Sequence, residues 1–150
     1  MHISSNAELR VEHQQVKNDI KIDVYDDAEH IGFVSYTKTP LLPFYILHSL
    51  YVYPNHRKKG YAKRFLPFVC QEIADAGATK IYIQPGPFEM SNDGIVNVED
   101  YQKRMEYLIP FYESMGFKKV DVILSWLASF IYKVANIQED AQHLMVKGIA

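Results

Sequence analysis

Residues 50–65 read LYVYPNHRKKGYAKRF. An apolar run ends at Val52, Pro54 breaks it, and apolar residues return at helical spacing from Ala62 until Gly77. We therefore expect a buried strand, a short turn and an amphipathic helix, in that order. The first N–H groups of a helix have no partner within it and lie at the positive end of the helix dipole. The start of this helix is thus predicted to bind an anion, most simply a phosphate.

The turn before the helix has the residue types that a phosphate site needs. Gly60 lets the backbone approach a diphosphate closely, and the small side chain of Ala62 leaves room for it. Arg57, Lys58 and Lys59 add positive charge. A nucleic-acid backbone is the competing ligand for this basic cluster, but no aromatic stacking motif is set among the cations. We therefore interpret the turn as a diphosphate site.

The composition is that of one globular domain. Apolar residues make up 48% and charged residues 23% of the 150 residues, and a chain of this length can bury a sizeable core. We expect a single domain over residues 1–150. Because the formal net charge is −2, neither nucleic acid nor an anionic membrane is an expected partner.

Cysteine usage and the apolar runs indicate a cytoplasmic protein. Cys70 is the only cysteine, which excludes an intrachain disulfide and a multi-cysteine metal site. Residues 1–12 lack the apolar core of a signal peptide. The longest apolar run, residues 120–137, is interrupted by polar and charged residues and is too polar to span a membrane.

The apolar periodicity predicts a mixed α/β sheet. The helix that contains Ala62 is expected to bend at Pro67. A second helix runs from Tyr101 to Gly116, and Pro110 leaves open a separate final turn. The expected strands cover residues 20–24, 31–36, 44–52, 80–84, 117–123 and 143–146; residues 85–97 are expected to form a loop and residues 126–142 a helix.

Two short motifs resemble those of the GNAT superfamily of acyl-CoA N-acyltransferases. Arg57-x-x-Gly60-x-Ala62 is similar to the coenzyme A loop of that superfamily, Arg/Gln-x-x-Gly-x-Gly/Ala. Tyr112-x-x-x-Gly116-Phe117 resembles its Tyr-x-x-x-Gly-Phe helix end. The resemblance covers roughly residues 18–123 and implies a GNAT-like fold, in which helices flank a mixed, mostly antiparallel central sheet.

The resemblance also implies an activity and a set of site residues. A neutral amine would attack the thioester of acetyl-CoA directly within a ternary complex, with no covalent enzyme intermediate and no metal. The Val52 N–H would polarise the thioester carbonyl. Tyr112 matches the acid that protonates the departing thiolate. The residues that would bind the cofactor are Val52, Arg57, Lys58, Lys59, Gly60, Tyr61 and Ala62.

The proton donor and the proton acceptor each have a structural alternative. A tyrosine keeps its proton at neutral pH, as an acid must, but Tyr112 is equally explained as an aromatic on the buried helix face. His48 lies four residues before Val52 and titrates in the range of a general base. A lone strand histidine is more often a hydrogen-bonded structural residue, so both assignments stay open.

Some features depart from the superfamily and concern the acceptor more than the cofactor. Met105 stands where many members have an asparagine, the usual N-terminal helices have little room, and residues 126–142 resemble an insertion. Phe88 and Met90 are candidates for lining an acceptor pocket. The acceptor is left open between a small-molecule and a protein amine, and so is a homodimer. A catalytically inactive acyl-CoA sensor or partner-docking module is the alternative function.

Overall fold

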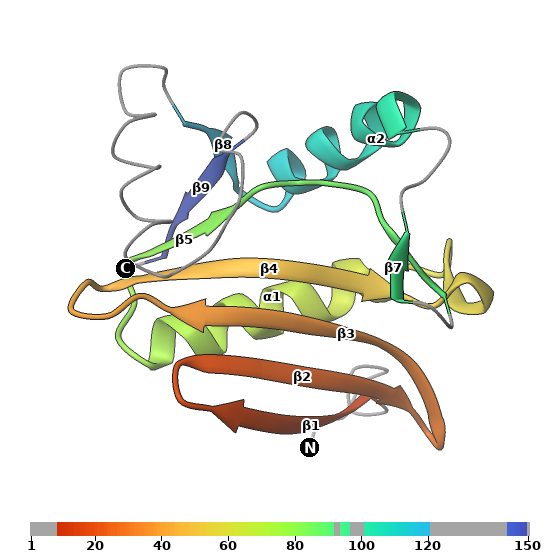
Figure 1. Ribbon diagram of the computed structural model, residues 1–150, viewed down its shortest axis with the longest axis horizontal. Helices are drawn as coiled ribbons and strands as arrows, with labels where there is room; N and C mark the ends of the chain where they lie inside the picture. The colour runs from red at the N-terminus through yellow and green to blue at the C-terminus, as the bar shows by residue number, and fades with distance from the viewer. Residues whose placement is uncertain (1–8, 92–93, 97–100, 121–143, 150) are drawn as a thin grey trace.

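A seven-stranded mixed sheet forms the body of the protein (Figure 1). The computed structural model describes residues 9–91, 94–96, 101–120 and 144–149. The strands lie in the order β1-β2-β3-β4-β5-β9-β8, and β4 with β5 is the parallel pair among antiparallel neighbours. The bounds are β1 Leu9–Val16, β2 Asp19–Asp26, β3 Glu29–Lys38, β4 Phe44–Val52, β5 Lys80–Ile83, β8 Lys118–Lys119 and β9 Met145–Gly148.

Two α-helices flank the sheet, α1 (Tyr61–Asp75) and α2 (Tyr101–Ser114). In Figure 1, α1 passes behind β3 and β4, and α2 lies on the side of β5 and β8. α1 buries the apolar positions that its 3.6-residue period predicts, because this stripe packs on the sheet. Neither described helix is long and apolar enough to cross a membrane. The buried residues of α1 are Phe65, Leu66, Val69, Cys70 and Ile73.

Strands β2 to β4 have two chemically different faces. Side chains alternate between the faces of a strand. One face, which we call the helix face, packs on α1 and includes Ile22, Val34 and Tyr36. The opposite face, which we call the polar face, includes Asp23 and Thr37. The main hydrophobic cluster therefore lies on the helix face, although Ile46 and Tyr51 on the polar face are also buried.

The sheet opens between β4 and β5. The parallel pairing joins Phe44–Leu47 to Lys80–Ile83 and stops there, although β4 continues to Val52. At the same point the β3–β4 register shifts, because Ser35 pairs with Ser49 and Tyr36 with Leu47. His48 is the extra residue of this β-bulge, which bends β4 away from β5. We call the resulting gap the fork.

Most predicted elements are confirmed, and so is the mixed α/β class. The expected hairpin is β2 and β3, the central strand is β4, and the two helices are α1 and α2. α1 continues through Pro67, and Pro110 lies inside α2 rather than starting a separate turn. The predicted helix over residues 126–142 lies outside the described residues, as does the end of the strand predicted over residues 117–123.

One local prediction is wrong, and one strand was not predicted. Residues 85–97 are not all loop, because β6 (Glu89–Ser91) and β7 (Gly94–Val96) pair as a small antiparallel hairpin. Strands of three residues are too short to show a period in the sequence. β1 was missed because it is an edge strand whose side chains are mostly exposed and polar, so it has no alternating apolar pattern.

Candidate functional site

The loop before α1 has the conformation that an anion site requires. Gly60 is the N-cap of α1 at φ 81°, and no side chain of a described residue caps the helix. The first turn contains no acidic residue, so its N–H groups are left for an external acceptor. A Cβ on Gly60 would meet no atom of a described residue within 4 Å. Lys58 and Lys59 are exposed beside this open space.

Arg57 and Tyr61 hold the loop against the sheet. Arg57 donates from Nε to the Val52 carbonyl at 2.8 Å, and its guanidinium carbon lies 5.2 Å from the centre of the Tyr51 ring. The Tyr61 hydroxyl donates to Asp26 Oδ2 at 2.5 Å, and this bond raises the pKa of Tyr61. The structure thus brings together the predicted residues Val52, Arg57 and Tyr61 at the end of β4.

The backbone of β4 offers donors to the fork. Successive N–H groups of a strand point to opposite edges. Tyr53 N–H bonds to the Ile31 carbonyl at 2.9 Å, on the β3 side, so the N–H of Val52 points to the other edge, and so does that of Leu50. No described strand pairs with β4 at that edge beyond Leu47. Leu50 is a second candidate donor that the sequence did not single out.

Gln84 lies at the base of the fork and was not predicted as a site residue. It follows Ile83, the last β5 residue paired with β4. Its side-chain oxygen is buried and accepts no hydrogen bond from a described residue. Such an oxygen is costly to leave unpaired, so it points to a missing donor. The only signal in the sequence is that Gln84 is polar at the end of a buried strand.

His48 is part of a hydrogen-bonded chain across the polar face. Its Nε2 lies 2.5 Å from Thr37 Oγ1, and that hydroxyl donates to Asp19 Oδ1 at 2.6 Å. Burial lowers the pKa of His48, and the negative charge of Asp19 opposes this shift. The imidazole is therefore neutral near pH 7, as a general base must be. Neither Thr37 nor Asp19 was predicted as a partner of His48.

Tyr112 lies in the core at 5% exposure. Its ring makes edge contacts with Phe111 and Phe117, with centroids 5.2 and 5.7 Å away. Burial raises the pKa of Tyr112, so the phenol keeps its proton at any pH at which an acid is needed. This environment is compatible with a proton donor and with a purely structural aromatic.

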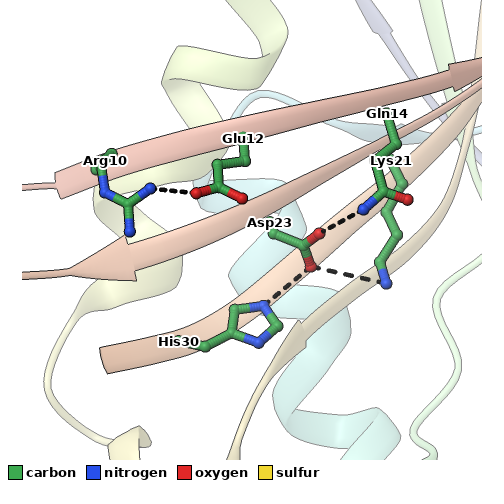
Figure 2. Close-up of polar contacts among 6 residues, drawn as sticks. All are labelled: Arg10, Glu12, Gln14, Lys21, Asp23 and His30. Carbon is green, nitrogen blue, oxygen red and sulfur yellow. Dashed lines mark hydrogen bonds and ion pairs between the residues drawn. The ribbon is translucent and has the colours of Figure 1, made fainter. Parts of the chain in front are cut away.

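Aromatic rings and a buried carboxylate surround the polar face near the end of β4. Asp23 is only 5% exposed and lies 2.9 Å from His30 Nε2 and 3.6 Å from Lys21 Nζ (Figure 2). The predicted pocket residue Phe88 stacks on Tyr51 at 5.0 Å. Further rings in the same series are Tyr25, His30, Phe33 and Tyr53.

The comparison with known protein families identifies the class to which this fold and loop belong. The model of the GNAT acetyltransferase domain matches residues 22–119, more than half of the chain. The chain therefore belongs to the GNAT acetyltransferase family. No curated protein sequence matches the chain significantly.

Solved structures share the fold at low sequence identity. GCN5 from Tetrahymena superposes with a TM-score of 0.61 at 13% identity, over 90% of this chain and 71% of that one. Spermidine N-acetyltransferase from Vibrio cholerae, in complex with coenzyme A and spermine, gives 0.55 at 16%, over 70% and 54%. Ribosomal-protein-S18-alanine N-acetyltransferase from Escherichia coli gives 0.51 at 16%, over 71% and 57%. The chain thus covers less than two thirds of the last two proteins.

Proposed function

We propose that the protein transfers an acetyl group from acetyl-CoA to a primary amine by direct attack in a ternary complex. The observation that carries this proposal is the continuity of the fork with the uncapped start of α1. The edge of β4 that pairs with no described strand ends at Val52, and the loop to Gly60 follows at once. One extended ligand with a diphosphate at one end and a thioester at the other fits both features.

Coenzyme A would be held mainly by backbone groups. The N–H groups from Lys58 to Ala62 would bind the diphosphate, with Lys58 and Lys59 adding charge. The Val52 N–H, joined by that of Leu50, would polarise the thioester carbonyl, and one such donor contributes about 3 kcal/mol to the transition state. The Gln84 oxygen would accept an amide N–H of the pantetheine arm.

His48 and Tyr112 would transfer the protons of the reaction. His48 takes a proton from the ammonium form of the acceptor, and the resulting neutral amine attacks the thioester carbon. The new C–N bond forms as the C–S bond breaks. Tyr112 gives its proton to the departing thiolate and regains one from the new amide nitrogen through water. The acetylated amine and the thiol of coenzyme A are the products.

The acceptor would approach from the polar face, because α1 covers the other face. Among the structural neighbours, one is a spermidine and one a ribosomal-protein alanine N-acetyltransferase. Small-molecule and protein amines are accordingly both candidates, and both belong in the first acceptor panel.

A second candidate is an acyl-CoA-binding module without turnover. The burial of Tyr112 among Phe111 and Phe117 favours it, since a core aromatic needs no catalytic role. Release of free coenzyme A thiol from acetyl-CoA, measured with polyamines, amino acids and peptide N-termini, separates the two candidates. We expect amine-dependent release that Tyr112→Phe lowers at least about tenfold.

Tyr107→Phe is the matched control for this assay, because Tyr107 lies on the same helix at 73% exposure. It should leave the rate unchanged. Binding of acetyl-CoA without thiol release from any amine class would support the module without turnover. Absence of acetyl-CoA binding would contradict both candidates.

A further inference from the structure

The hydrogen bonds around Thr37 have a defined direction. A hydroxyl has one proton to donate, and an ionised carboxylate only accepts. Thr37 donates its proton to Asp19 at 2.6 Å. In its 2.5 Å contact with His48 Nε2, the Thr37 oxygen must then accept. His48 therefore has its proton on Nε2.

This assignment leaves a lone pair on the other ring nitrogen. In a neutral imidazole one nitrogen donates and the other accepts, so with Nε2 protonated the accepting nitrogen is Nδ1. No contact of Nδ1 with a described residue accompanies the Nε2 contact. The basic nitrogen is thus the one that no described residue engages.

The backbone explains why His48 reaches Thr37. Asp19 and Thr37 are register partners of β2 and β3, and Thr37 pairs with Ile46 of β4. The bulge at His48 shifts β4 by one residue, which turns the imidazole toward the Thr37 hydroxyl. Thr37 is 5% exposed, so water competes little for this bond. The chain of groups starts at the exposed Asp19 and ends at His48, the bulge residue of β4.

We propose that Thr37 and Asp19 are positioning residues that hold His48 as the Nε2–H tautomer, so that Nδ1 takes the proton of the acceptor amine. This inference rests on the proposed function, in which His48 is the base. The proton moves from the ammonium nitrogen to Nδ1, and the N–H bond that breaks leaves its electron pair on the amine. The imidazolium keeps its Nε2–H bond to Thr37, beside the charge of Asp19, and later releases the Nδ1 proton to solvent.

Nitrogen NMR of the imidazole tests the tautomer without any need for activity. The two ring nitrogens of a neutral histidine differ widely in 15N shift according to which one has the proton. We expect the His48 signals, assigned by their loss in His48→Gln, to show the Nε2–H form in the wild-type protein. A predominant Nδ1–H form would overturn the proposal whether or not the protein is an acetyltransferase.

Substitutions at Thr37 test the consequence for turnover. Thr37→Val should lower kcat by roughly tenfold and mix the tautomers, because the acceptor for Nε2–H is lost, and Thr37→Ser should restore both. Thr39→Val is the matched control, since Thr39 is fully buried nearby and its hydroxyl has no described partner. An unchanged kcat and tautomer in folded Thr37→Val would overturn the proposal. If the wild-type protein does not bind acetyl-CoA, the proposed function is wrong, but the tautomer measured by NMR is unaffected.

Discussion

The two faces of strands β2 to β4 are formed by alternate residues of the same strands, yet one is apolar and packed and the other is polar and hydrogen-bonded. On the helix face, Ile22 and Val34 are completely buried against the core that α1 completes. On the polar face, neighbouring residues form hydrogen bonds and ion pairs, such as Thr37 with His48 and Asp23 with His30. Because the side-chain period of a strand is 2, one segment can supply both a core and a chemical surface. Substitutions on the helix face should therefore act mainly on stability, and those on the polar face should also act on activity.

The largest effect is expected for α1, where it packs on the helix face. Phe65→Ala should lower the free energy of unfolding by about 3–5 kcal/mol, because Phe65 is 2% exposed and its loss leaves a cavity. Denaturant unfolding measures this change. Phe68→Ala, three residues along the same helix at 41% exposure, is the control and should cost far less. Equal losses would mean that α1 does not pack as described.

On the polar face, the expected signature is a pH dependence. Burial lowers the pKa of His48 from its ordinary 6.5, so the base is active at pH 7 and kcat should fall about tenfold per pH unit only below that lowered pKa. Burial raises the pKa of Tyr112, so no alkaline loss from this group is expected up to about pH 9. The measurement is kcat at saturating substrates across this range. An acidic limb that persists unchanged in His48→Gln would contradict the role of His48.

At the fork we expect a smaller effect, which falls on acetyl-CoA binding and not on stability. Gln84→Met removes a buried oxygen that has no described partner, so the free energy of unfolding should stay equal or rise. Binding of acetyl-CoA should weaken by about fivefold, the value of one net hydrogen bond. Calorimetric titration and thermal unfolding of the same sample test both parts. A destabilised variant with unchanged affinity would show that Gln84 serves the fold.

The smallest effect is expected at Thr39. Thr39→Val replaces a buried hydroxyl without a described partner and should raise the free energy of unfolding by up to about 1 kcal/mol. Thr37→Val, two residues away, should lower it, since that hydroxyl bonds to both Asp19 and His48. Chemical denaturation of the two variants gives the comparison, and the same sign of change in both would contradict the described hydrogen bonds.

The elements with a strong period could be predicted from the sequence. The apolar stripe of α1, the apolar run of β4 and the glycine before α1 can each be recognised within one continuous stretch of sequence. β1 and the β6–β7 hairpin could not be predicted, because the first is a polar edge strand and the second is set by backbone pairing over three residues. These elements depend on contacts, which leave no periodic pattern in the sequence.

The candidate site also contains residues that could be predicted from the sequence and residues that could not. Val52, Arg57 and Gly60 were predicted because they fall within one short segment. The partners of His48 could not be, since Thr37 and Asp19 come from other strands and reach it through the register and a bulge. Gln84 was missed because its significance is an unpaired oxygen, which only packing reveals.

Calorimetric titration of acetyl-CoA into Gly60→Glu and Gly77→Glu tests whether coenzyme A binds at the start of α1. Both glycines have positive φ, 81° and 100°, and neither would place a Cβ within 4 Å of a described atom. They lie at opposite ends of α1. Both variants place a side chain on a residue with positive φ and add one negative charge. We expect Gly60→Glu to weaken binding by more than about 100-fold through repulsion of the diphosphate, and Gly77→Glu to bind like the wild-type protein. Equal affinities in the two variants would contradict a coenzyme A site at the start of α1.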